Sequence, residues 1–77
     1  MHGGVTARRD LVRALAQLGG RPRSKGGETI VAFAGTTIII GRRDFSRSMI
    51  CRVERKLAAA QITAAQLWAA LGRPPQD

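Results

Sequence analysis

The chain has few acidic residues, few aromatic residues and a single cysteine. Five aspartates and glutamates stand against thirteen lysines and arginines, so the formal net charge is +8 over 77 residues. A charge of this size is an argument about partners and not about fold, and it indicates a polyanion. Most of the cations are arginines, whose planar guanidinium suits phosphate groups. The scattered acids offer no pair of carboxylates for glycosidase-type chemistry.

The scarcity of cysteine and histidine excludes several kinds of site. Cys51 is the single cysteine and cannot form an internal disulfide, which favours a reducing, cytoplasmic compartment. His2 is the single histidine, so the chain offers neither a Ser-His-Asp set nor a cluster of metal ligands. The sequence therefore predicts a protein without a metal or another cofactor.

Long apolar runs are missing as well. No stretch reaches the roughly 18–20 residues that a membrane-spanning helix needs, and the first residues lack the charged and apolar regions of a secretory signal. We therefore expect a cytoplasmic protein with no membrane partner. A chain this short holds one modest core, which we place in a single domain over residues 6–72, between disordered tails at 1–5 and 73–77.

The first helix is predicted over residues 6–18. Leu11 and Leu15 begin an apolar stripe at helical spacing. Thr6 is placed as the N-cap, because its hydroxyl can accept a hydrogen bond from a backbone N–H of the first turn. Gly19 stands where a left-handed residue commonly follows the end of a helix.

Two further helices are predicted in the C-terminal half. The first covers residues 44–60, where Asp44 or Ser46 can cap its start. The second covers residues 63–72 and carries the clearest local signal in the chain. Thr63 and Gln66 have the spacing of a capping box, in which each side chain accepts a hydrogen bond from the other residue's backbone N–H.

Between the helices, two runs rich in β-branched residues predict antiparallel strands at residues 29–34 and 37–40. Gly35 between them supplies the positive φ of a tight hairpin. The preceding segment, Arg21–Lys25, is either a loop or a short edge strand. The predicted fold class is α+β: a small antiparallel sheet, a hairpin with or without a third strand, packed by helices in the order α-β-β(-β)-α-α.

Cations frame this predicted hairpin on both sides. Arginine and lysine supply the salt-dependent part of nucleic-acid affinity, and backbone N–H groups of a glycine turn can approach a phosphate closely. Three other cations, Arg8, Arg9 and Arg73, are expected only to solvate the surface. The residues predicted to bind a nucleic acid are Arg21, Arg23, Lys25, Gly26, Gly27, Arg42, Arg43 and Arg47.

The order of the motifs resembles that of the HicA-type mRNA interferase toxins. Arg9, Asp10 and Leu11 open a helix similar to the family's (R/K)-D-L helix, and residues 25–28 stand where the family has K-G-S-H before its first long strand. Residues 37–40 resemble the strand with V-T-(I/V)-P. Residues 44–53 and 59–67 resemble the family's D-L-x-x-G-T-L-x-x-I-L and (Q/A)-A-G-I-S-x-E-E-F segments. The resemblance spans residues 6–71, and the order of the pieces carries it.

This resemblance implies a fold like that of double-stranded-RNA-binding domains, with RNA as substrate and an antitoxin as protein partner. Members of the family cleave mRNA with the histidine of K-G-S-H, and here Glu28 occupies that position. Cleavage through the 2′-hydroxyl needs a group that accepts and donates a proton near neutral pH, as histidine does. We therefore predict a HicA-like RNA-binding protein with weak or no interferase activity.

Other functions stay open at this point. One is an active endoribonuclease toxin in which Glu28 takes the catalytic place of the histidine. Another is a protein-binding module, in which residues 38–40 on a sheet edge pair with a strand of an antitoxin or of a second copy, giving a homodimer. A third is a DNA-binding regulator of a phage or plasmid.

Overall fold

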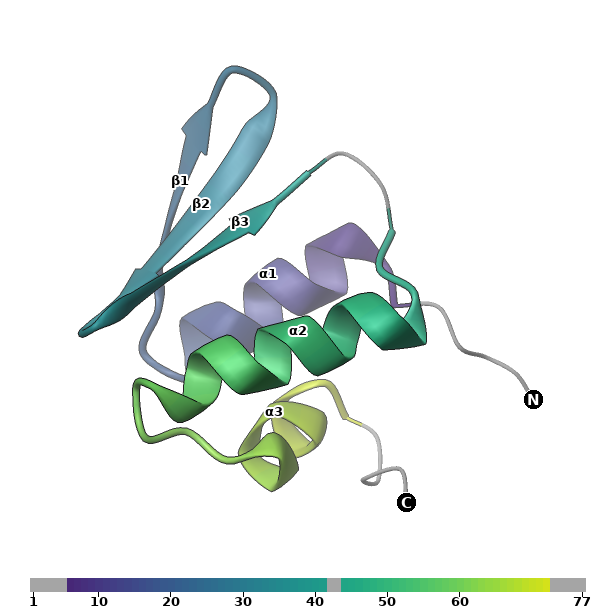
Figure 1. The fold of residues 1–77 in the computed structure, drawn as a ribbon. Helices are drawn as coiled ribbons and strands as arrows, with labels where there is room; N and C mark the ends of the chain where they lie inside the picture. The colour runs from purple at the N-terminus through teal and green to yellow at the C-terminus, as the bar shows by residue number, and fades with distance from the viewer. Residues whose placement is uncertain (1–5, 42–43, 73–77) are drawn as a thin grey trace.

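The computed structural model describes residues 6–41 and 44–72, without the side chain of Arg47. A three-stranded antiparallel sheet packs against helices in an α+β fold (Figure 1). The predicted fold class is confirmed, and the segment that was either loop or strand is a strand. The predicted tails at 1–5 and 73–77 lie outside the described residues. The elements are α1 (Arg8–Gln17), β1 (Arg21–Lys25), β2 (Glu28–Phe33), β3 (Thr36–Ile40), α2 (Arg47–Ala58) and α3 (Ala64–Ala70).

The sheet has the strand order β1-β2-β3, with β2 in the centre. Both connections are tight hairpins, at Gly26 and Gly27 and at Ala34 and Gly35. Residues directly opposite each other in an antiparallel pair share a face of the sheet. One face is defined by the buried Val31 of β2. The other face carries Ile30 and Ala32, the neighbours of Val31 in β2, and the residues opposite them in β1 and β3.

The helices all lie on one side of the sheet (Figure 1), and the buried Val31 belongs to the face that they cover. α1 packs on β1 and β2, α2 packs on β3, and α3 packs behind them on α1 and α2. The core between these layers is mainly aliphatic, as a sequence with so few aromatic residues requires. The buried apolar residues are Leu11, Ala14, Leu15, Val31, Ile38, Ile40, Phe45, Ile50, Val53, Leu57, Leu67 and Trp68.

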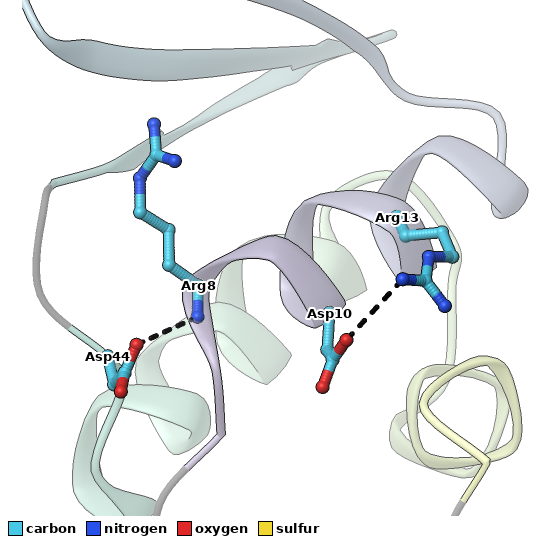
Figure 2. Close-up of polar contacts among 4 residues, drawn as sticks. All are labelled: Arg8, Asp10, Arg13 and Asp44. Carbon is cyan, nitrogen blue, oxygen red and sulfur yellow. Dashed lines mark hydrogen bonds and ion pairs between the residues drawn. The ribbon is translucent and has the colours of Figure 1, made fainter.

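The start of α1 differs from the prediction. Its N-cap is Ala7, so the prediction that Thr6 caps this helix is wrong. Thr6 instead forms an antiparallel bridge with Phe45, in which each backbone N–H donates to the other residue's carbonyl, at 2.8 and 2.9 Å. Asp44 takes over the capping role, because its Oδ1 accepts the backbone N–H of Arg8 at 3.1 Å (Figure 2). A carboxylate there also suits the positive end of the helix dipole.

The two C-terminal helices begin at caps that the sequence contains. Ser46 caps α2 by accepting the backbone N–H of Met49 at 3.4 Å, so Ser46 fills this position and Asp44 does not. In α3 the predicted capping box is confirmed. Thr63 Oγ1 accepts the N–H of Gln66 at 3.1 Å, and Gln66 Oε1 accepts the N–H of Thr63 at 2.8 Å.

Candidate nucleic-acid interface

The three cations of β1 lie on one face of the sheet. Arg21, Arg23 and Lys25 are exposed and occupy alternate positions of the strand, and alternate side chains point the same way. The register pairs Arg23 with Ile30, which alternates along β2 with the buried Val31. The three cations therefore face away from the helices. We call these three residues the cation row, and the helix-free side of the sheet the open face.

Apolar surface lies beside the cation row. The half-buried Ile30 separates Arg23 from Ile39 of β3 on the open face. Ile39 is 55% exposed, which is unusual for so large an apolar side chain. The sequence contains a signal for this surface, since three consecutive isoleucines in a strand cannot all face the same core. The open face thus combines a row of cations at one edge with an apolar strip towards the other.

Gly26 and Gly27 have a conformational role in the turn between β1 and β2. Their φ angles are +58° and +91°. A type I′ hairpin turn requires positive φ at both of its central positions, which glycine adopts without steric strain. The pair therefore fixes the hairpin that carries the cation row. Their predicted approach to a phosphate stays a prediction.

Glu28 begins β2 directly opposite Lys25, on the open face. Its side chain is exposed, and it is the single acidic residue on the described part of that face. The chain's one histidine, His2, lies outside the described residues. The described face therefore offers cations to hold a phosphate and one exposed carboxylate to move a proton.

Three of the predicted cations are not placed. Arg42 and Arg43 lie outside the described residues. Arg47 is the first residue of α2, and its side chain is outside the description. Of the predicted nucleic-acid-binding residues, the structure brings together the cation row and the glycine turn. The parts assigned to Arg42, Arg43 and Arg47 stay predictions.

Arg8 has a structural role, so the expectation that it only solvates the surface is wrong. Its side chain is half-buried and reaches from α1 to the sheet (Figure 2). Nε donates a hydrogen bond to the carbonyl of Gly41 at 2.9 Å, and Nη2 donates one to Thr29 Oγ1 at 2.6 Å. Arg13 contrasts with it, because it pairs with Asp10 in an exposed contact of 3.6 Å along the same helix.

Other kinds of site find little support. Within residues 6–41 and 44–72, no three His, Cys, Asp or Glu side chains gather in a way that could hold a metal ion. Cys51 is exposed on α2. None of the described helices has the length and apolar character to cross a membrane.

Comparisons with known proteins leave the family open: the chain matches no protein-family model, no curated protein and no solved structure. The α+β class rests on the structure of the chain itself. The resemblance to HicA-type toxins, and with it the likeness to double-stranded-RNA-binding domains, stays a prediction from the order of the sequence motifs.

Proposed function

We propose that this protein binds RNA on the open face of its sheet, with the cation row contacting the phosphate backbone. The observation that carries the proposal is the alternation of Arg21, Arg23 and Lys25 along β1, which directs three exposed cations to the side that the helices leave uncovered. A net charge of +8 favours the approach of any polyanion to this surface.

The spacing of the cation row suits a nucleic-acid backbone. Side chains two positions apart on a strand are separated by about 6.5–7 Å, which is similar to the spacing of successive phosphates in an extended strand. Each arginine can donate two parallel hydrogen bonds to one phosphate, whereas Lys25 acts as a point charge. The row can therefore follow a strand over several nucleotides without reading its bases.

Base recognition has little support on this face. Base stacking on a protein sheet requires aromatic side chains. Phe45 and Trp68 are buried. Phe33 lies two positions from the buried Val31 along β2, so it faces the helices. The described residues thus put no aromatic ring on the open face. We propose binding that depends on salt and varies little with base sequence.

The choice of RNA, and the proposal of weak or no mRNA interferase activity, are supported by the resemblance to HicA-type toxins. In that family a histidine stands where this chain has Glu28. An exposed carboxylate opposite Lys25 is a poor replacement for a group that both accepts and donates a proton near neutral pH. An antitoxin as protein partner is a further proposal from the same resemblance.

A salt titration tests the proposed function. Fluorescence anisotropy would compare labelled single-stranded RNA, duplex RNA and single-stranded DNA of one sequence. We expect the tightest binding to RNA, with a slope of log K against log salt of about −2 on single strands, because each neutralised phosphate contributes roughly −0.7. A slope near zero contradicts phosphate binding by the cation row, and tighter binding to DNA contradicts the choice of RNA.

Replacing Glu28 by glutamine separates binding from catalysis. We expect Glu28→Gln to bind RNA about two- to fivefold more tightly, because an exposed charge pair contributes up to about 1 kcal/mol and the carboxylate repels phosphate. The measurement is the same anisotropy titration, paired with a gel assay of labelled mRNA. Cleavage by the unaltered protein that disappears in Glu28→Gln would instead identify an active endoribonuclease with Glu28 in a catalytic role.

A further inference from the structure

The residues of β3 itself lack the usual protection of an edge strand against strand addition. The sheet order makes β1 and β3 its two edge strands. β1 contains Pro22 and the cation row, and both proline and charge prevent a further strand from pairing. β3 reads Thr-Thr-Ile-Ile-Ile, without proline or charge, and its Ile39 is largely exposed. An apolar edge of this kind is a template for another strand.

In β3, two residues direct their backbone N–H and C=O groups towards the outer edge. Lys56 Nζ, on α2, donates a hydrogen bond to the carbonyl of Thr37 at 3.3 Å, which places this carbonyl on the side away from β2. In an antiparallel strand the N–H and C=O of one residue point the same way, and every second residue repeats that direction. The N–H and C=O of Ile39 therefore also point outward, while Ile38 pairs inward with Val31.

A groove follows this edge between β3 and α2 and has a volume of about 280 Å³. α2 runs alongside β3 below the sheet (Figure 1). The groove has an apolar floor and two cationic side chains, and its described lining contains no acidic residue. We call it the β3 groove. Its lining residues are Ile38, Ile39, Gly41, Phe45, Met49, Arg52, Val53 and Lys56.

We propose that the β3 groove binds an extended, acidic segment of another protein, which pairs with β3 as a fourth strand. The segment exchanges backbone hydrogen bonds with Ile39, and its apolar side chains lie beside Ile39 on the open face, because directly opposite residues share a face. Its carboxylates alternate with these apolar residues, so they point into the groove and meet Arg52 and Lys56, which lie one helical turn apart on α2. This site lies along the sheet edge opposite the cation row, so the proposal does not depend on RNA binding.

A second copy of this chain is a poorer occupant of the groove. Pairing two β3 strands about a two-fold axis would bring Arg52 and Lys56 of both copies towards one interface, and each chain carries a net charge of +8. Like charges in such an arrangement weaken association. An acidic segment neutralises the same two cations, so charge complementarity favours a different protein.

The probe for this site is a capped peptide of alternating glutamate and valine, titrated into the full-length, nitrogen-15-labelled protein. The first control peptide alternates glutamate with proline, which keeps the charge and removes the backbone N–H groups that would face Ile39. The second alternates lysine with valine, which reverses the charge. We expect the glutamate–valine peptide to bind about tenfold more tightly than either control. Hydrogen exchange of the Ile39 amide should slow by a similar factor in the bound state, because its N–H becomes hydrogen-bonded.

Matched variants locate the binding. The double change Arg52→Glu and Lys56→Glu should abolish binding of the acidic peptide, whereas Arg55→Glu, an exposed position of the same helix outside the groove lining, should retain it. Equal affinities for the two glutamate peptides, or an unchanged Ile39 amide, would overturn strand addition. An RNA oligonucleotide that protects Ile39, or a concentration-dependent dimer formed through β3 in sedimentation, would overturn the assignment to an acidic protein segment.

Discussion

Alanine at Arg21, Arg23 and Lys25 together is expected to weaken binding of single-stranded RNA by on the order of 100-fold near physiological salt. Each exposed cation contributes up to about 1 kcal/mol, and every 1.4 kcal/mol is a factor of about ten in affinity. The three side chains share the open face and cooperate on one backbone. The salt slope should fall towards zero in the same variant, because the counterion release of all three contacts is lost. Anisotropy titrations at several salt concentrations measure both quantities.

A second triple variant removes the same charge from the helices. Arg9, Arg13 and Arg55 are exposed on α1 and α2, on the far side of the sheet from the open face. Their replacement by alanine lowers the net charge equally, and we expect less than about a threefold change in affinity, since these cations act only through the screened long-range field. Equal losses in both triple variants would show that charge alone, and no cation row, governs binding.

Replacing Arg8 by methionine is expected to lower the free energy of unfolding by about 2–4 kcal/mol. Methionine keeps an unbranched apolar stem and removes the guanidinium, which donates to the Gly41 carbonyl and to Thr29 Oγ1. The loss leaves Thr29, a buried residue of the sheet, without this donor. A domain of this length has a total stability of about 4–12 kcal/mol, so the change is a large fraction of it. Urea unfolding followed by circular dichroism measures the effect.

The control for this prediction is the neighbouring Arg9→Met. Arg9 is exposed on the same helix turn, and surface changes of this kind shift stability by less than about 0.5 kcal/mol. Arg8→Lys should lie between the two, because one ammonium group cannot reproduce the two directed hydrogen bonds of the guanidinium. A stability of Arg8→Met within error of Arg9→Met would show that the contacts of Arg8 contribute nothing measurable to folding.

Several local features of the fold are predictable from the sequence because neighbouring residues alone produce them. The capping box of Thr63 and Gln66 spans one helical turn, and its two hydrogen bonds close within that turn. The β-branched runs on either side of Ala34 and Gly35 form the expected hairpin for the same reason, since short connections join adjacent antiparallel strands. Arg21–Lys25 is less determined, because an exposed edge strand has no buried face to set its pattern.

The errors concern residues whose partners are far away in the sequence. Thr6 is a good N-cap by type, yet its backbone pairs with Phe45, and Asp44 caps α1 from a position 36 residues away. Arg8 looks like a surface cation beside Arg9, yet it reaches Thr29 and Gly41 across the interface between helix and sheet. No local pattern contains these contacts, because they exist only once α1 is docked on the sheet.

The candidate site also has some features that the sequence determines locally and others that depend on long-range packing. The sequence by itself determines the charge of +8, the substitution of Glu28 where the resemblance expects histidine, and the presence of the cations Arg21, Arg23 and Lys25. Only the tertiary structure decides that these cations share the helix-free face, because the register with β2 and the packing of the helices against Val31 assign the two faces. It likewise decides that β3 is an edge with α2 beside it, since strand order depends on long-range pairing that no local pattern fixes.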